Sequence, residues 1–256
     1  MNEKKTEGLI IGTKHDITKY DGLTQVSINN EEIVLSTSVR DLGFTIDNNL
    51  TCNQQIQTVI RNVNFSLRNI AFIKRYLDED SMKKLVHNYI ISRLDYCNSL
   101  YYELPTYQLK KLQLVFNRAA RLIVGISPRE RITPVLIDLH WLPIKARIVF
   151  KICVLTYIAL NTDKPAYLRN KLNKFSTELG VSIRHSHDPH RLNEPRMNKE
   201  IGTRSFKYSA PRLFNNLPRS VKDSENLKVF KRKLKTYLFN ECYDLDTKTI
   251  TDSYCK

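Results

Sequence analysis

The chain has 256 residues, of which 41% are hydrophobic, and its 41 basic and 26 acidic side chains give a formal charge of +15. This length and apolar content are enough for one large domain or two modest ones. No run of about 18 apolar residues indicates a membrane span, and the charged start, MNEKKTEG, lacks the apolar stretch of a secretory signal. The excess positive charge favours polyphosphate partners, although many basic proteins bind none.

The five cysteines are dispersed, and none forms a C-x-x-C pair. An odd, scattered set favours a reducing compartment, with the thiols buried as small apolar groups, and argues against a zinc site formed by cysteines. We therefore expect an intracellular protein of the nucleus, the cytoplasm or both.

Residues 1–50 have the pattern of β-strands. The segments EGLIIGT, TQVSI, EIVLSTSV and DLGFTID are short apolar runs or alternate in polarity, and NNEE is a turn signal. We expect a β-hairpin or small antiparallel sheet here, with Gly43 at a bulge or at a close approach of another backbone.

From about residue 51 the apolar side chains recur every three or four residues, which predicts a helical domain over 51–160. The first helix has a polar side with Gln57, Arg61, Asn64, Arg68 and Arg75. A second helix begins near the capping candidates Asp78 and Ser81, and a third spans about 107–124. The segment IKARIVFKICVLTYIALN predicts the most buried helix of the set.

The remaining sequence is more polar. We predict a linker or loop over 161–204, a basic segment with a helix over 205–242, and a disordered tail over 243–256. The last helix has Ser224 or Asp223 as its cap and a basic stripe made of Lys228, Lys231, Arg232 and Lys235. The predicted fold class is α+β and mainly α.

Six blocks of the sequence carry a family resemblance. They are NEKKTEGLIIGT, VRDLGFTIDNNL, LVHNYIISRLDYCNSLYYELP, LQLVFNRAARLI, ITPVLIDLHWLPIKARIVFKICVLTYIAL and RSFKYSAPRLFNNLP. In this order they resemble the reverse transcriptase of LINE-type, Jockey-like non-LTR retrotransposons. The resemblance covers residue 2 to about residue 239.

The resemblance implies an RNA-directed DNA polymerase whose palm aspartates hold two Mg²⁺ ions. Those aspartates would precede Met1, so we expect no catalytic residue and no cofactor in this chain, and we expect the upstream palm and fingers to be missing. LGFTID is similar to the strand before the primer grip, and the helices after residue 51 are similar to the thumb. Lys5 matches a lysine of the late palm motif that approaches the nucleotide, but its other reading is a solvated lysine at a strand edge.

A thumb helix lies against an RNA–DNA duplex, so the resemblance makes Arg61, Asn64, Arg68 and Arg75 candidate phosphate contacts. The basic stripe of the last helix is a second candidate. The other reading of both sets is an ordinary solvated helix face.

Two further patterns resemble metal sites. Tyr76-Leu77-Asp78-Glu79 is similar to the metal motif of reverse transcriptases, but it lacks the second aspartate and lies after the primer-grip block, so we interpret it as a helix start. The histidines of RHSHDPH lack the further ligands of a zinc site, and we expect a solvated loop. We therefore predict no metal site.

The stretch SRLDYCNSLYYELP combines charges, a thiol and tyrosines, as an active site would. On a helical wheel its side chains continue an apolar stripe, which predicts a buried helix with Cys97 in the core. Buried charges require partners. We therefore list Arg93, Asp95, Arg118 and Arg121 as buried structural residues, with Asp95 paired to Arg118 or Arg121 and Arg93 bound to a carboxylate or carbonyl. Contact with phosphate is the alternative for Arg118 and Arg121.

The sequence thus predicts a reverse transcriptase fragment that binds template–primer RNA–DNA duplex and RNA but performs no chemistry alone. Because Met1 falls inside a β-rich unit, we expect a truncated or decayed element. Two alternatives remain open: a domesticated helical module that binds a protein partner, and an inert relic of the element.

Overall fold

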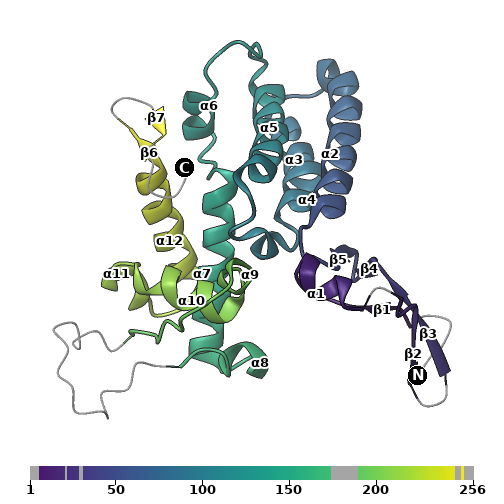
Figure 1. Cartoon of the computed structure of the whole chain (residues 1–256). Coiled ribbons are helices and arrows are strands. Elements are labelled where there is room, and N and C mark those ends of the chain that lie inside the picture. The colour runs from purple at the N-terminus through teal and green to yellow at the C-terminus, as the bar shows by residue number, and fades with distance from the viewer. Residues whose placement is uncertain (1–5, 21, 29–30, 174–189, 246–248, 251–256) are drawn as a thin grey trace.

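A computed structural model describes residues 6–20, 22–28, 31–173, 190–245 and 249–250 of the chain. The fold is α+β and mainly α, as predicted, with a small β region at one end of a helical body (Figure 1). The N-terminal part contains β1 (Gly8–Leu9), α1 (Lys14–Thr18), β2 (Gln25–Ile28), β3 (Glu31–Ser36), β4 (Ser38–Asp41) and β5 (Phe44–Asp47).

The helical body begins with α2 (Asn53–Ile73), the short turn η2 (Lys74–Tyr76), α3 (Glu79–Val86), a π-helical turn η3 (His87–Ile91), α4 (Ser92–Asp95) and a 3₁₀ turn η4 (Asn98–Tyr101). Next come α5 (Thr106–Val124), α6 (Thr133–Asp138), α7 (Ile144–Thr162) and α8 (Ala166–Arg169). The last elements are α9 (Glu200–Thr203), α10 (Phe206–Asn215), α11 (Arg219–Lys222), α12 (Leu227–Cys242), β6 (Tyr243–Asp244) and β7 (Thr249–Ile250).

The N-terminal sheet is mixed rather than purely antiparallel. β3 pairs antiparallel with β2 and parallel with β1, while β4 and β5 form a separate antiparallel hairpin. Leu42 and Gly43 connect the hairpin, both with positive φ, at 45° and 85°. A two-residue turn of this kind requires left-handed backbone, which glycine adopts at little cost. Gly43 therefore belongs to a turn, and the predicted bulge is wrong.

The β4–β5 hairpin is joined to the start of α2 by side-chain hydrogen bonds. The Asp47 carboxylate accepts from the backbone N–H groups of Thr51 and Cys52, at 2.8 and 2.7 Å. Gln55 Oε1 accepts from the Thr45 N–H at 2.9 Å. These bonds satisfy backbone donors at the end of the sheet and before the helix, so the hairpin is fixed against the first turn of α2.

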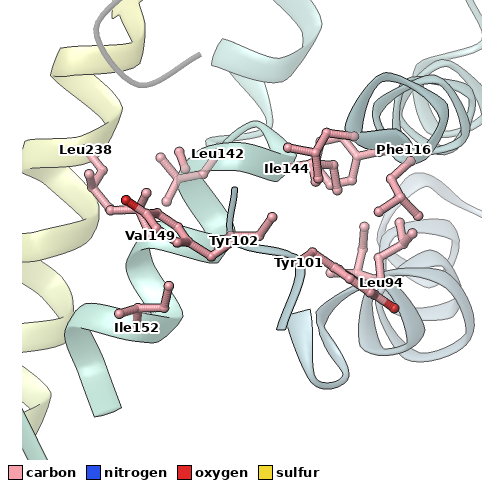
Figure 2. Close-up of a cluster of buried hydrophobic side chains, with 14 of the residues drawn as sticks. Leu94, Tyr101, Tyr102, Phe116, Leu142, Ile144, Val149, Ile152 and Leu238 are labelled. Carbon is pink, nitrogen blue, oxygen red and sulfur yellow. The ribbon is translucent and has the colours of Figure 1, made fainter. Parts of the chain in front are cut away.

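The helical body has one continuous core. α7 lies at its centre and packs against α5 on one side and against α10 and α12 on the other (Figure 1). Ten of its side chains are buried, which confirms the prediction for this segment. In the close-up, Tyr101 lies toward Leu94 and Tyr102 toward Val149, and Leu238 of α12 reaches the same cluster (Figure 2). Residues 51–160 and 205–242 therefore share a core and are not independent units.

The predicted linker and the predicted disordered tail both contain ordered structure in the parts that the structure describes. Within the predicted linker 161–204, the structure forms the short helices α8 and α9. Leu172 and Leu192 belong to the core cluster, because burying an apolar side chain is favourable. The predicted tail begins with strand β6, where Tyr243 is buried and its hydroxyl donates to the Trp141 carbonyl at 2.7 Å. Residues 174–189 lie outside the described part of the chain.

The cap of α12 also differs from the prediction. Asn226 occupies the position, and its side-chain oxygen accepts from the Val229 N–H at 3.0 Å. Ser224 instead donates to the Val221 carbonyl at 2.6 Å, and it is buried at the end of α11. All three side chains are capping residues by type, so only the position where the helix begins decides between them.

Candidate nucleic-acid interface

The outward side of α2 carries the arginines that the sequence singled out. Arg61, Arg68 and Arg75 are exposed, and their spacing of seven residues places them along one line of α2 and the η2 turn that follows it. None of the three forms an ion pair within the described residues. Their exposure is compatible with both interpretations of this helix side, phosphate contact and a solvated face.

Two phenylalanines interrupt this row of arginines. Phe65 is 58% exposed and Phe72 is 73% exposed, each four residues after an arginine. Large aromatic side chains that face solvent on a helix are candidates for a contact surface. At the end of the row the Arg75 guanidinium lies over the Tyr76 ring, 5.3 Å from its centroid. Both phenylalanines stand among the polar residues of this helix in the sequence, but the prediction named only the polar residues.

Helix α5 extends the same surface. It packs beside α2, and Arg118 Nη1 donates to Asn64 Oδ1 across the two helices at 3.4 Å (Figure 1). Its outward side carries exposed Tyr107, Lys111, Leu114 and Arg118, with Lys111 over the Tyr107 ring at 5.5 Å. We call the combined surface the α2–α5 face. It is made of Arg61, Phe65, Arg68, Phe72, Arg75, Tyr107, Lys111, Leu114 and Arg118.

The α2–α5 face has no acidic residue on either helix. Neither 53–73 nor 106–124 contains an aspartate or glutamate. The nearest acids along the chain are Glu103, three residues before α5, and Asp78, five residues after α2. Glu79 and Asp80, at the start of α3, are paired with Lys83 and Lys84. The positive charge of the face is therefore uncompensated by its own helices, which is the condition for attracting a polyanion.

Asp95 has a different partner from the one predicted. Its carboxylate accepts two bonds from Arg147 of α7, Nε–Oδ1 at 2.8 Å and a second bond from Nη2 to Oδ2, while Asn98 Nδ2 donates to Oδ1 at 3.3 Å. The predicted pairing with Arg118 or Arg121 is wrong because α7, rather than α5, faces this side of α4. The bidentate pair ties α4 to the central helix.

The four residues predicted as buried structural charges are in fact more exposed. Arg93 and Arg118 are exposed, while Asp95 and Arg121 are half-buried. Arg93 donates to the Asn62 carbonyl at 3.1 Å and to Ser66 Oγ at 2.8 Å, so the prediction of a carbonyl partner is confirmed. Arg121 donates to the Glu130 carbonyl at 3.1 Å. Their long aliphatic stems allow the charged ends to reach the surface.

The stretch from Ser92 to Pro105 is not one buried helix. The π-helical turn at 87–91 shifts the helical phase, and the helix ends at Tyr96, where ψ is 120°, before Cys97 with φ of 51°. As a result Tyr96 is exposed and its hydroxyl donates to the Leu42 carbonyl. The helical wheel behind the prediction of one buried helix does not apply across these breaks, so that prediction is wrong.

The cysteines show no reactive setting within the described residues. Cys52, Cys153 and Cys242 are buried and Cys97 is half-buried, while Cys255 lies outside the described part. Burial raises the pKa of the Cys52 thiol to about 11 and that of Cys153 to about 12. Thiols with pKa values this high stay protonated near neutral pH and are poor nucleophiles.

The pattern that resembled a metal motif is a helix cap, as interpreted. The Asp78 carboxylate accepts from the Ser81 N–H at 2.9 Å, and its hydrogen bonds with Ser81 lower the Asp78 pKa. No group of three or more His, Cys, Asp or Glu side chains in the described residues could hold a metal. His190 lies 2.7 Å from Asp223, whereas His185 and His187 lie outside the described residues, as does Lys5.

The basic stripe of α12 is exposed as expected. Lys228, Lys231, Arg232 and Lys235 all face away from the core, where Phe230, Leu234 and Leu238 are buried. α12 lies on the far side of α7 from α2 and α5 (Figure 1). The two basic surfaces are therefore separated by the core.

No helix among the described residues is long and apolar enough to cross a membrane. Comparisons of the chain with protein-family models, curated proteins and solved structures found no match in any of the three.

Proposed function

We propose that this chain binds RNA–DNA template–primer duplex through the α2–α5 face, as the thumb-like part of a LINE-type reverse transcriptase. The observation that carries the proposal is the face itself: two parallel rows of exposed cations and aromatic side chains on helices without a single acidic residue. The order of the six sequence blocks supports the same function. RNA alone is a second expected ligand, since backbone contacts do not require a particular partner strand.

The spacing of the arginines suits contact with a nucleic-acid backbone. With a rise of about 1.5 Å per residue, Arg61 and Arg75 lie roughly 20 Å apart along the helix, so the row can reach several successive phosphates. Arginine presents a planar fork that matches phosphate oxygens. Contacts of this kind fix position without reading sequence, so we expect little sequence preference.

The aromatic side chains add a second type of contact. An RNA–DNA duplex approaches A-form geometry, whose minor groove is wide and shallow and exposes sugars. Phe65 and Phe72 are placed between the arginines and can pack on such apolar sugar surface. The β4–β5 hairpin, which carries the block similar to the primer-grip strand, is fixed to the first turn of α2 and is the proposed neighbour of the primer end.

We propose no catalytic residue in this chain. In the family that the sequence resembles, Mg²⁺ is held by palm aspartates that precede the matching blocks. A primer-extension assay of this chain with Mg²⁺ is expected to give no product, and extension of the primer would overturn the proposed role as a binding fragment.

The test of binding is the affinity for a labelled RNA–DNA duplex across a salt series. We expect binding at about 50 mM salt and a steep loss by about 200 mM, because each phosphate that is neutralised releases counterions. The exposed Phe65 and Phe72 also favour the rival function, a module that binds a protein partner. Absence of binding at low salt, or affinity that hardly changes with salt, would remove the basis of the nucleic-acid proposal and leave the rival.

A further inference from the structure

A cavity of about 400 Å³ lies between the start of the helical body and its C-terminal helix. Its walls come from η3, α4, η4, the loop after α6, α7 and α12. The volume is within the roughly 300–1,000 Å³ of small-molecule sites. The cavity is separate from the α2–α5 face, because none of the residues of that face lines it.

The polar lining of the cavity is mainly cationic. Lys151 and Arg147 of α7 and Lys235 of α12 contribute its positive charges, and Asp95 is the one acidic residue in its lining. His87 and His140 add imidazole rings to the lining. Asp95 is already bound by Arg147 through two bonds, so its charge is committed to that pair. Neither Lys151 nor Lys235 has an ion-pair partner in the part of the chain that the structure describes.

The positive charges influence one another. Partial desolvation and the neighbouring Arg147 guanidinium lower the pKa of the Lys235 ammonium. Bringing like charges together at a hollow surface is unfavourable unless an anion enters. The cavity is therefore electrostatically suited to a group with negative charge, and phosphate is the anion for which lysine is a common ligand.

One buried polar atom of the lining lacks a partner. Asn98 is only 4% exposed, and its Nδ2 donates to Asp95, which fixes the orientation of the amide. Its Oδ1 accepts from no described group. A buried carbonyl without a donor costs free energy, which a ligand can recover by supplying an N–H or O–H group. A ligand that carries hydroxyl or amine groups beside its phosphate can do so.

The remaining lining is apolar and aromatic. Ile91, Leu139, Leu142 and Phe150 contribute to the walls, together with Trp141. The ring of His140 stacks on Phe239, with centroids 5.5 Å apart and an angle of 13° between the planes. A flat apolar group such as a nucleobase is therefore compatible with the walls, whereas these side chains provide few donors or acceptors for telling one base from another.

We propose that this cavity binds a nucleoside 5′-monophosphate group, either as a free nucleotide or at the 5′ end of a nucleic-acid strand. Lys151 and Lys235 bind the phosphate. The Asn98 carbonyl oxygen is covered in the structure, and a small movement of the lining on binding lets it accept from a hydroxyl or amine of the nucleoside. This inference does not depend on duplex binding by the α2–α5 face.

The chain contains a single tryptophan, Trp141, and it lines the cavity, so its fluorescence reports on this place alone. Equilibrium dialysis of the full chain with labelled AMP is expected to show saturable binding of one molecule per chain, accompanied by a change in Trp141 fluorescence. Adenosine and inorganic phosphate are each expected to bind at least about tenfold more weakly, since each lacks half of the contacts. GMP, CMP and UMP are expected to bind with affinities similar to that of AMP.

Variants locate the site. K151A and K235A remove exposed side chains, and each is expected to weaken AMP binding about tenfold or more. K231A is the matched control, since Lys231 is exposed on the same helix as Lys235 but does not line the cavity. The triple variant R61A/R68A/R75A is a second control and is expected to bind AMP as the wild type does.

The two sources of the group are separated by competition. A short single strand with a 5′-phosphate that displaces AMP better than the same strand with a 5′-hydroxyl assigns the site to strand ends, while failure of both strands to displace AMP assigns it to free nucleotides. The proposal is overturned by dialysis that detects neither AMP nor 5′-phosphate binding, by K151A and K235A binding AMP as K231A does, or by adenosine binding as well as AMP. Loss of AMP binding in R61A/R68A/R75A would also overturn it, because the phosphate would then be held on the α2–α5 face.

Discussion

The α2–α5 face and the α12 stripe are both basic, yet they differ in composition. The α2–α5 face carries four arginines and one lysine with exposed aromatic residues between them. The stripe on α12 is made of three lysines and Arg232, and no large apolar side chain is exposed along that helix. Similar net charge therefore accompanies two different surfaces.

The difference in composition indicates which of the two surfaces is suited to binding a duplex in one defined orientation. Arginine forms planar bidentate contacts with phosphate, whereas lysine acts as a flexible point charge. Aromatic side chains add contact area that salt does not screen. We therefore expect the α2–α5 face to bind duplex in a defined way and the α12 stripe to contribute general attraction, with Lys235 at its cavity end.

The largest expected effect comes from the arginine row. R61A/R68A/R75A is expected to reduce affinity for an RNA–DNA duplex by about a hundredfold or more at about 0.1 M salt, because three phosphate contacts are lost. The matched control is K228A/K231A/R232A, which removes the same charge from exposed positions on α12. Equal losses in the two variants would show that charge alone, and not the face, determines binding.

The ion pair between Asp95 and Arg147 joins α4, which contacts α2 of the α2–α5 face, to α7, which packs against α12. The side chains are 35% and 19% exposed, so solvent weakens their attraction and D95A is expected to lower the free energy of unfolding by only about 1–2 kcal/mol. Denaturant unfolding with a D95A/R147M cycle measures the coupling. K83A, which breaks the more exposed pair with Glu79, serves as the control and is expected to resemble the wild type. A coupling indistinguishable from zero would contradict the role given to the pair.

A smaller effect is expected from the aromatic residues of the face. F65A/F72A removes exposed apolar contact without removing charge, so duplex affinity is expected to fall by roughly three- to tenfold while its salt dependence stays the same. Fluorescence anisotropy at several salt concentrations measures both quantities. A changed salt dependence would mean that the phenylalanines act by positioning the arginines.

The smallest effect is expected from α12. K228A/K231A/R232A is expected to reduce affinity for a short duplex by less than about threefold, because the core separates α12 from the α2–α5 face. A longer duplex, which can reach both surfaces, is expected to show a larger reduction. If the short duplex lost most of its affinity in this variant, α12 would be the principal surface.

Periodicity in the sequence predicted the long helices well. α2, α5, α7 and α12 each repeat apolar residues over four turns or more, so their buried sides could be assigned without tertiary information. The exposed arginines followed from the same pattern. Phe65 and Phe72 could also have been predicted as exposed, because both fall on the otherwise polar side of the predicted helix.

Other features depend on contacts that a local pattern does not contain. Asp95 and Arg147 are 52 residues apart, and their pairing depends on how α7 crosses α4. The helical wheel failed for residues 87–97, because one π-helical turn and the break at Cys97 change which side chains face inward. Tyr243 and Leu192 are single apolar residues in polar surroundings, and their burial follows only from tertiary packing.

The most direct test of the central claim is the slope of duplex affinity against salt for the wild type and for R61A/R68A/R75A. A plot of the logarithm of affinity against the logarithm of salt concentration has a negative slope. If each arginine neutralises one phosphate, the magnitude of this slope is expected to be smaller by roughly 2.7 in the variant, about 0.9 for each lost contact. An unchanged slope, with the variant binding as tightly as the wild type, would contradict the assignment of nucleic-acid binding to the α2–α5 face.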